Sequence, residues 1–468
     1  MSGLAAIGST NAPRRITLVG GGLAGALLAA LLARRGHHVD VFERRPDARK
    51  RGYEGGRSIN LALAMRGLAV LREAGLGDAV LQQAVAMRGR MVHPREGAIN
   101  FQPYGQSDRE CIWSVHRGRL NLLLLDAADA AGAKLHFHQR LNYVDFAGRR
   151  AEFIDDHERT ARWVDFDSLI GADGAGSALR AAMQRHVDLH EHFEPLGHGY
   201  KELEIPPQAD GGFRIARDAL HIWPRGGYML IALPNTEGTF TATLFLAHQG
   251  GSPSFAELPT ADGARAFFER EFPDALALMP GLAADWADNP TSGLATLRLK
   301  RWHLDGRAVL LGDAAHAMVP FHGQGMNCAF EDVAALDRLL ADHADLADAF
   351  AAFEADRRPN AEAIQAMALE NYVEMRDSVD NPDWRRQRAL ELMLADRHPG
   401  RFVPRYSMVS FTRTPYAVAF ERGRWQRELL VDATRGIDDV AQVDLAALDA
   451  RIVAGLKPLP VDWLAPAA

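Results

Sequence analysis

A glycine-rich turn near the N-terminus has the residue types that hold a pyrophosphate. Gly20, Gly22 and Gly25 fit the spacing G-x-G-x-x-G directly after the β-branched run 15–20. In such a turn the first glycine permits a tight bend, the second lets the backbone approach a pyrophosphate, and the third lets helix and strand pack closely. Glu43 ends the next predicted strand, where a carboxylate can accept hydrogen bonds from adenosine ribose hydroxyls. A dinucleotide site is predicted by the combination of this glycine turn with the strand before it, the helix after it and the acid at the end of the next strand.

Two later acidic residues at strand ends select FAD as the dinucleotide. Arg44, next to Glu43, is also expected at the cofactor; it would suit the 2′-phosphate of NADP, but the acid that precedes it disfavours that group. Asp173 and Asp313 lie in the segments GADG and LLGD, each directly after a predicted strand, and a carboxylate there can hold a polyol hydroxyl. FAD contains a ribitol chain and NAD does not. We therefore expect Gly312 and these two aspartates to contact FAD.

The loop after Asp313 has the composition of a flavin-binding turn. It leads into a predicted helix, and the N–H groups at a helix N-terminus can face an electron-poor ring that becomes anionic when it is reduced. His316 and His322 are interpreted as packing or hydrogen-bonding residues of this loop, and Cys328 as a small buried residue. The loop residues expected to contact FAD are Gly323, Gln324, Gly325, Met326 and Asn327.

The elements that position these motifs predict a parallel sheet and a second, antiparallel sheet. Strand 15–20, helix 23–35 and strand 38–43 form a βαβ unit, whose crossover is right-handed. One strand over 164–170 leads into GADG. Turn residues separate three further strands, which predict the antiparallel sheet, over 220–223, 228–233 and 239–246.

The fold class that follows is α/β: a FAD-binding Rossmann-like domain with an inserted antiparallel-sheet substrate domain and a helical C-terminal region. The helical pattern is long from 327 to 379, with a break predicted at Pro359. The expected boundaries are 14–184 and 301–345 for the two parts of the FAD-binding domain, 185–300 for the inserted sheet and 346–468 for the helical region.

The composition excludes several classes of protein. The chain has 468 residues, 47% of them hydrophobic and 24% charged, which is typical of globular proteins. Two cysteines cannot build a disulfide scaffold or a cysteine-ligated metal site, and we expect no metal. The net charge of −7 disfavours nucleic acid as a partner. Without a secretory signal or an apolar run of about 20 residues, we expect no membrane anchor and a cytoplasmic location.

The order of the glycine turn, the DG pair 173–174 and the GD pair 312–313 resembles the FAD-dependent aromatic hydroxylases of the para-hydroxybenzoate hydroxylase type. This match covers about residues 14–345. Longer strings place the resemblance in one branch of that family and extend it over nearly the whole chain. They are 56–64 (GRSINLALA), 87–91 (MRGRM), 103–105 (PYG), 319–327 (VPFHGQGMN), 370–372 (ENY) and 406–411 (YSMVSF).

The resemblance implies a monooxygenase that uses non-covalent FAD, NADPH and O2 to hydroxylate L-kynurenine to 3-hydroxy-L-kynurenine. That reaction belongs to tryptophan degradation and to quinolinate and NAD biosynthesis. A hydroperoxide at flavin C4a carries the chemistry in this family, so no catalytic side chain is expected. Since no second glycine-rich dinucleotide motif is present, NADPH is expected to bind transiently across the FAD domain.

The resemblance also implies residue roles. At the flavin it implies contacts from Ala62 and Arg117. Four residues are implied to hold the amino-acid end of the substrate: Arg90, Tyr104, Asn371 and Tyr406. Two are implied to pack on its aromatic ring: Phe245 and Phe321. General chemistry agrees for Arg90, because a carboxylate in an apolar pocket needs a cation and arginine offers a planar two-bond fork.

Two alternatives stay open at this point. The chain could be a hydroxylase of the same fold with another aromatic acid as substrate, or a non-catalytic FAD-binding redox protein. A flavin halogenase is disfavoured because the string W-x-W-x-I-P is missing, and a disulfide reductase because no cysteine pair lies near the first helix. Both a monomer and a homodimer are compatible with the sequence. Eukaryotic members of the family add a C-terminal membrane helix that this sequence lacks, so their location is not transferred.

Overall fold

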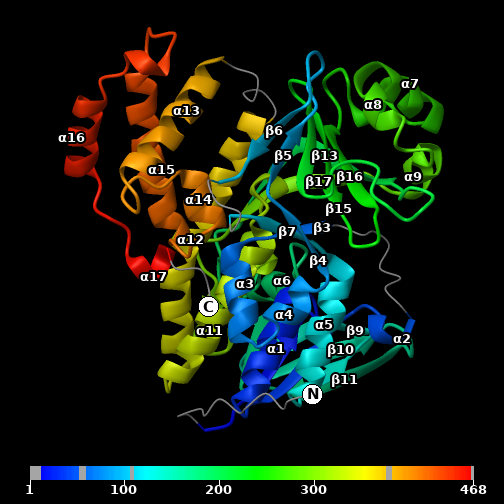
Figure 1. Ribbon diagram of the computed structural model, residues 1–468. Helices are drawn as coiled ribbons and strands as arrows, with labels where there is room; N and C mark the ends of the chain where they lie inside the picture. Colours follow the sequence, from blue (N-terminus) through cyan, green and yellow to red (C-terminus); the bar gives the residue numbers. More distant parts are fainter. Residues whose placement is uncertain (1–11, 52–59, 106–109, 376–381, 465–468) are drawn as a thin grey trace.

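The computed structural model describes residues 12–51, 60–105, 110–375 and 382–464. A six-stranded sheet lies in the lower half of the molecule as drawn in Figure 1. Its strands are parallel except at the β18–β19 edge. In sheet order they are β18 (His303–Leu304), β19 (Ala308–Leu310), β12 (Ser168–Gly171), β1 (Arg15–Val19), β2 (His38–Phe42) and β8 (Lys134–His136).

Helix α1 (Leu23–Arg34) is apolar around most of its circumference because other elements enclose it. Leu27, Leu28 and Leu32 are fully buried in the core that the helix shares with the six-stranded sheet. Helices α5 (Arg117–Ala130) and α11 (Gly325–Asp342) pack against it. A helix enclosed in this way needs no polar face.

The single strand predicted over 164–170 is wrong. The structure has two strands there: β11 (Thr160–Asp165) in an antiparallel sheet, and β12, which begins at Ser168, in the parallel sheet. The chain turns between them at Asp167, whose carboxylate accepts a hydrogen bond from the Arg15 N–H at 2.7 Å. The partners of β11 in the antiparallel sheet are β10 (Arg150–Asp155) and β9 (Gln139–Asp145).

The second large sheet has seven strands and contains the three strands predicted to be antiparallel, within one residue at each end. One face packs on α7 (Ala261–Glu271), α8 (Pro273–Leu276) and α9 (Leu282–Asp288), and the other faces α12 (Leu346–Val373). In order the strands are β17 (Ser292–Arg298), β13 (His192–Ile205), β16 (Phe240–Ala247), β15 (Met229–Pro234), β14 (Ala219–Pro224), β5 (Gly89–Val92) and β6 (Asn100–Pro103).

Strands β5 and β6 come from outside the range 185–300 expected for the inserted sheet. Strand β5 pairs in parallel with β14, which places Arg90 opposite Leu220. The sheet therefore takes strands from two separate parts of the chain, and the domain boundaries stay a prediction. A third, smaller sheet contains β3 (Asn60–Leu63), β7 (Ile112–His116) and β4 (Ala84–Met87).

The helical break predicted at Pro359 is wrong. The break lies between α11 and α12, where Asp345 caps α12 by accepting hydrogen bonds from the N–H groups of Ala347 and Asp348. Pro359 lies inside α12, and the next residue, Asn360, donates a side-chain hydrogen bond to the Asp356 carbonyl at 2.8 Å. Pro359 lacks the N–H that would reach the Ala355 carbonyl, and the helix continues past it.

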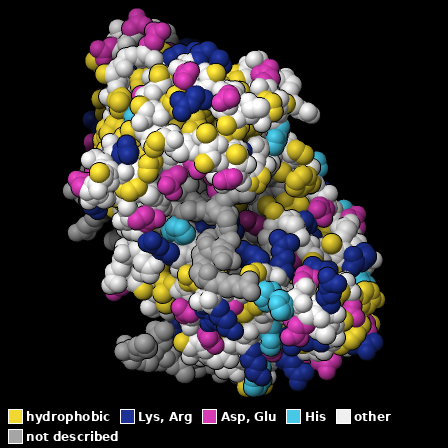
Figure 2. Space-filling view, turned by 90° about the vertical axis from the view of Figure 1, so that its right-hand side faces the viewer, with side chains coloured by type: hydrophobic (Ala, Val, Ile, Leu, Met, Phe, Trp, Pro, Cys, Tyr) yellow, Lys and Arg dark blue, Asp and Glu magenta, His cyan; other side chains and the backbone are white. Residues whose placement is uncertain are grey.

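The C-terminal helices gather at the upper left of Figure 1, next to the seven-stranded sheet. They are α13 (Pro382–Arg397), α14 (Arg405–Ser410), α15 (Tyr416–Ala433), α16 (Leu445–Gly455) and α17 (Val461–Leu464). Within the described residues, no helix combines the length and the apolar character that crossing a bilayer requires. The remaining helices are α2 (Ala48–Arg51), α3 (Met65–Glu73), α4 (Gly77–Leu81), α6 (Ala178–Gln184) and α10 (Asp313–His316). On the face shown in Figure 2, acidic and basic side chains lie interspersed.

Candidate functional site

The glycine turn forms an open cradle at the N-terminus of α1. Gly20 has a φ of +103°, and a Cβ there would lie 2.5 Å from the Ala172 carbonyl oxygen. A Cβ on Gly25 would lie 2.0 Å from the Gly20 carbonyl oxygen, so strand and helix leave no room for a side chain. A Cβ on Gly22 would meet nothing within 4 Å, and no side chain caps the helix. The first N–H groups of α1 therefore face open space that suits a pyrophosphate.

Glu43 lies beside this turn at the end of β2, and its neighbour Arg45 holds it. The Glu43 carboxylate accepts hydrogen bonds from the Gly21 N–H at 2.8 Å and from the Arg45 backbone N–H and Nε at 2.9 and 2.8 Å. Burial acts to raise the pKa of Glu43, but the hydrogen bonds and charge of Arg45 outweigh burial and lower it. Arg44 is exposed and has no hydrogen-bond partner among the described residues. Its predicted role at the cofactor stays a prediction.

Asp173 is a partly satisfied carboxylate at the end of β12. One of its oxygens, Oδ2, accepts hydrogen bonds from the N–H groups of Ala178 and Leu179 at 2.7 and 3.2 Å, at the start of α6. The other, Oδ1, is buried and has no hydrogen-bond partner among the described residues. Burial raises the pKa of this group. An oxygen in this state can accept a hydrogen bond from a ligand.

The GD turn brings Asp313 next to two helix N-termini. Gly312 has a φ of +58°, and a Cβ there would lie 3.9 Å from the Ala24 Cβ on α1. A Cβ on Gly325, the first residue of α11, would lie 3.9 Å from Asp313 Oδ1. The Asp313 carboxylate is exposed and accepts no hydrogen bond from any described residue. It is therefore available to a ligand that spans α1 and α11.

Asn327 joins the predicted flavin loop to β3. Its side-chain amide donates hydrogen bonds to the carbonyls of Ala62 and Gly323, both at 2.8 Å, and its Oδ1 accepts one from the Ala64 N–H at 2.9 Å. The side chain is fully buried, so it serves the loop itself. Ala62 and Asn327 are thus brought together as predicted sites, and Asn327 retains its backbone N–H for a ligand.

The side chain of Gln324, like that of Asn327, forms a hydrogen bond within the protein at the start of α11. Its Oε1 accepts a hydrogen bond from the Tyr416 hydroxyl at 2.9 Å, and no side chain caps the helix. The N–H groups of Gly325, Met326 and Asn327 lie in the first turn, where an α-helix provides no acceptor. Arg117, in contrast, is exposed at the first residue of α5 and has no described hydrogen-bond partner. Its contact with the flavin stays a prediction.

These donors and acceptors fit FAD. The N–H groups of α1 suit its pyrophosphate, the carboxylates of Glu43 and Asp313 suit hydroxyls of ribose and ribitol, and the N–H groups of α11 suit the flavin ring. Asn121 supports this set, because its side-chain amide donates a hydrogen bond to the Gly21 carbonyl at 3.1 Å. Neither Asn121 nor Arg45 was predicted from the sequence, because no motif marks either residue.

A second site is a cavity of about 350 Å³ between β5, β6 and the C-terminal helices. Four of the six residues predicted to hold the substrate line it, on three separate parts of the chain. They are Arg90, Tyr104, Asn371 and Tyr406. His322 of the flavin loop also lines the cavity, which therefore adjoins the predicted cofactor site.

Arg90 lies close to the rings of two tyrosines at this cavity. Its guanidinium carbon is 5.8 Å from the centre of the Tyr104 ring and 5.2 Å from that of the Tyr406 ring. Among the described residues, no carboxylate lies within ion-pair distance of it, but the charge of Glu374, which lines the same cavity, acts to raise the pKa of Arg90. Burial raises the pKa of the Tyr104 phenol far above its usual range, so the hydroxyl stays protonated. The cavity thus offers a cation that no carboxylate contacts directly, together with the neutral Tyr104 hydroxyl.

Phe245 and Phe321 do not line this cavity. They lie in an adjoining apolar cluster, with their ring centres 5.0 Å apart, and Phe321 stacks on Tyr372 at 4.2 Å. Asn371 connects cluster and cavity, because its side-chain amide donates a hydrogen bond to the Phe321 carbonyl at 2.6 Å. The contact of Phe245 and Phe321 with a substrate ring stays a prediction.

His322 is a site residue whose position the sequence did not indicate. Its ring lies 5.5 Å from that of Tyr406 and nearly parallel to it. Burial lowers the pKa of His322 to about 3, so the ring is neutral. Its Nδ1 is buried and has no hydrogen-bond partner among the described residues.

The family of the chain follows from its relatives. The FAD binding domain family matches residues 15–368. A kynurenine 3-monooxygenase of Xanthomonas axonopodis pv. citri (strain 306) is 61% identical over 446 residues, which cover 95% of this chain and 98% of the relative. A kynurenine 3-monooxygenase of Xanthomonas campestris pv. campestris (strain 8004) is 59% identical over 447 residues, covering 96% and 98%.

Solved structures of lower identity share the fold. 2-Methyl-3-hydroxypyridine-5-carboxylic acid oxygenase superposes with a TM-score of 0.64 at 22% identity, over 79% of this chain and 94% of that one. Tetracycline destructase Tet(55) superposes with a TM-score of 0.63 at 18% identity, over 82% and 97%. Fold and relatives agree on a FAD-binding protein, which confirms the α/β fold class and the resemblance. The chain belongs to the kynurenine 3-monooxygenase family.

Proposed function

We propose that this protein is a FAD-dependent monooxygenase that hydroxylates L-kynurenine to 3-hydroxy-L-kynurenine with NADPH and O2. The observation that carries the proposal is the guanidinium of Arg90, which lies at a cavity beside the cofactor loop and forms no direct ion pair with a described carboxylate, although Glu374 lines the same cavity. The half-buried guanidinium favours an anionic ligand, because a charge that is partly removed from water is stabilised by a paired opposite charge. The carboxylate of kynurenine is such a ligand.

FAD binds across the N-termini of α1 and α11 in this proposal. The α1 turn at Gly22 receives the pyrophosphate, Glu43 the ribose, Asp313 the ribitol, and the first turn of α11 the flavin ring. Asp173 offers a further acceptor through its buried Oδ1. When bound, the flavin supplies the electron transfer from NADPH and the activation of O2. Every other task falls to the protein's own residues.

The amino-acid end of kynurenine binds at Arg90. The guanidinium forms a two-bond pair with the carboxylate, and the hydroxyls of Tyr104 and Tyr406 add neutral donors on the same side. Asn371 is fixed by its hydrogen bond to the Phe321 carbonyl, so its position follows that of the flavin loop. Anchoring one end of the substrate in this way orients the ring for reaction at a single carbon.

The apolar cluster beside the cavity limits the access of water. Phe245 and Phe321 are 3% and 7% exposed, and Tyr372 stacks on Phe321. His322 stays neutral at physiological pH, since its pKa is about 3. A neutral, largely apolar wall suits an aromatic ring and excludes the solvent that would divert the reaction toward hydrogen peroxide.

The experiment is to purify the yellow protein, measure its FAD content and test a panel of aromatic acids for hydroxylation. The proposal predicts non-covalently bound FAD and turnover of L-kynurenine, with 3-hydroxy-L-kynurenine as product. Hydroxylation of another aromatic acid and not of kynurenine would contradict the proposed substrate, but it would leave the proposed reaction type in place. Colourless protein that does not take up FAD would contradict the proposal. A cytoplasmic location and a monomeric or homodimeric state remain predictions.

A further inference from the structure

Arg66, the second residue of α3, is a fully buried cation that holds the end of α14. Its Nε donates a hydrogen bond to the Val409 carbonyl at 2.8 Å, and its Nη2 donates to the carbonyls of Met408 and Thr414 at 3.1 and 2.9 Å. The last carbonyls of a helix have no partner within the helix, so Arg66 satisfies two of those of α14. Since α14 carries Tyr406, Arg66 positions one wall of the substrate cavity.

A chain of ion pairs continues from Arg66 across α11 and α12. Arg66 Nη1 contacts Glu331 Oε1 at 2.8 Å, and the other Glu331 oxygen contacts Arg357 Nη2 at 3.2 Å. Arg357 Nε in turn contacts Asp332 Oδ1 at 2.8 Å. The two cations and two anions alternate, so the chain is neutral as a whole.

The far end of this chain holds the GD turn of the cofactor site. Asp332, which is fully buried, accepts hydrogen bonds through Oδ2 from the Gly312 N–H at 3.0 Å and from His316 Nε2 at 2.6 Å. Asp332, His316 and Cys328 bring potential metal ligands within 4.8 Å of one another. Arg357 already pairs with Asp332 and lies 3.8 Å from Cys328 Sγ, so a resident cation occupies the place of a metal.

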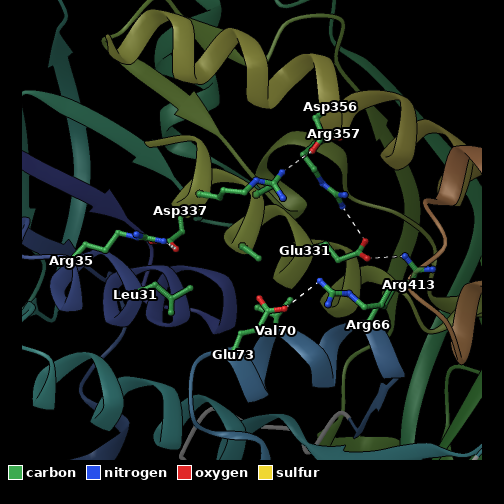
Figure 3. Close-up of a pocket in the computed structure, with 13 residues that line it drawn as sticks. Leu31, Arg35, Arg66, Val70, Glu73, Glu331, Asp337, Asp356, Arg357 and Arg413 are labelled. Atoms are coloured by element: carbon green, nitrogen blue, oxygen red, sulfur yellow. Dashed lines mark hydrogen bonds and ion pairs between the residues drawn. The ribbon is translucent and has the colours of Figure 1, made fainter. Parts of the chain in front are cut away.

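Figure 3 shows that Arg66, Glu331 and Arg357 converge at the wall of another cavity, of about 320 Å³, which is separate from the substrate cavity. The Glu331 side chain is 18% exposed there, whereas that of Arg66 is not exposed. Glu331 is therefore the link of the chain that water can reach. Glu73 and Arg413 line the same cavity and form an ion pair at 3.2 Å. Among the described residues, neither side chain forms a hydrogen bond with an α14 carbonyl or with the GD turn.

We propose that Glu331 is a positioning residue that couples kynurenine binding at α14 to FAD binding at the GD turn. The inference rests on the proposed function and adds a connection between its two sites. Within the described part of the chain, Glu331 is the one anion that contacts both arginines. A shift of α14 that moves Arg66 therefore changes the place of Arg357 and, through Asp332, that of Gly312. Contiguous charged networks of this kind carry coupling when both sites bias the same arrangement.

The test measures the FAD dissociation constant by equilibrium dilution of the holoenzyme, with and without saturating L-kynurenine. In the parent protein kynurenine should tighten FAD binding by about fivefold or more, the lower end of typical coupling between sites. By linkage, FAD should tighten kynurenine binding by the same factor. In Glu331→Gln both ligands should still bind, but the ratio of the two FAD constants should fall to about one. Glutamine keeps the shape of Glu331 but presents an N–H₂ donor to one of the two arginines.

Glu73→Gln is the matched control, because it removes the same charge from the same cavity. It should leave the coupling ratio at the parent value. Arg66→Lys is the second variant, since lysine keeps the charge but cannot reach Glu331 and three carbonyls together; it should also lower the ratio.

An unchanged ratio in Glu331→Gln and Arg66→Lys would overturn the inference, even if both variants melt at lower temperature. A parent protein that hydroxylates kynurenine with a ratio of one would overturn the coupling alone. A parent protein that does not bind kynurenine would overturn the proposed function as well.

Discussion

The guanidinium carbon of Arg90 lies 5.2 Å from the centre of the Tyr406 ring, although the two residues are 316 positions apart in the sequence. Arg90 comes from β5 of the seven-stranded sheet and Tyr406 from the short helix α14. A cation above an aromatic face keeps some stabilisation after it leaves water, which an isolated buried arginine would lack. The pair therefore holds a charge ready for a carboxylate at the cavity.

Replacing Arg90 should weaken kynurenine binding and leave FAD bound. Arg90→Ala leaves the substrate carboxylate desolvated and unpaired, at a cost of about 2–5 kcal/mol. Arg90→Lys should restore little, because an ammonium cannot form the two parallel bonds. Kynurenine titration of the holoenzyme measures the dissociation constant. Arg427→Ala is the control, since Arg427 is an exposed arginine that lines the same cavity.

A decarboxylated kynurenine analogue identifies the group that Arg90 binds. The analogue should bind the parent protein poorly, and Arg90→Ala should penalise it far less than it penalises kynurenine. Titrating both ligands against both proteins closes a double cycle. Equal penalties for the two ligands would mean that Arg90 does not bind the carboxylate.

Asp313→Ala should weaken the retention of FAD. The Asp313 carboxylate is exposed and lies beside the first residue of α11, so it can accept a hydrogen bond from a ribitol hydroxyl. Loss of a charged acceptor costs about 1.5–3 kcal/mol. Recovery of flavin fluorescence on dilution measures the dissociation constant. Glu362→Ala, an exposed acid on α12, should leave it unchanged, and equal FAD affinity in Asp313→Ala would remove Asp313 from the site.

The folded protein should lose stability as the pH falls from about 7 toward 4. His221 is buried, and burial lowers its pKa from 6.5 to about 4. Between these values the unfolded chain binds a proton that the folded chain does not, so the free energy of unfolding falls by at most about 1.4 kcal/mol per pH unit. His322, with a pKa of about 3, acts in the same direction.

The measurement is urea unfolding at a series of pH values. His221→Asn should flatten the slope of unfolding free energy against pH, because one of the histidines whose pKa is lowered by burial no longer titrates. His157→Asn, at an exposed position, should leave the slope unchanged. A parent slope of zero or of opposite sign would contradict this account of His221.

L-Kynurenine should accelerate the reduction of the flavin by NADPH. Asn371 lines the substrate cavity and donates a hydrogen bond to the Phe321 carbonyl of the flavin loop, so an occupied cavity can alter the loop. Such control prevents an idle reduced flavin from turning O2 into hydrogen peroxide. Stopped-flow absorbance measures the rate with kynurenine and with an aliphatic amino acid as control. Equal rates would indicate another substrate or an unregulated oxidase.

The cofactor half of the site was predictable from the sequence because its signals are local. Gly20, Gly22 and Gly25 lie within six residues of one turn, and the helix predicted over 23–35 is α1. Contacts between distant parts of the chain carry no such signal. Arg66 reaches the Val409 carbonyl across 343 positions, and β5 joins a sheet that the pattern of turns assigned to another segment.

The substrate half was predicted only through the resemblance. No spacing connects Arg90 with Tyr406, and either tyrosine alone reads as a core residue. Phe245 and Phe321 show the opposite difficulty: the resemblance assigned them to the substrate ring, whereas the structure places them in the cluster behind the cavity. Their contact with the substrate ring stays a prediction.

The most direct test of the proposed function is the ratio of 3-hydroxy-L-kynurenine formed to NADPH oxidised by the purified holoenzyme. The account predicts slow NADPH oxidation without kynurenine, and with kynurenine about one molecule of product, hydroxylated at ring position 3, per NADPH. Mass spectrometry of the product and a peroxide assay measure the two outcomes together. NADPH oxidation that kynurenine does not change, with hydrogen peroxide as the only product, would contradict the account.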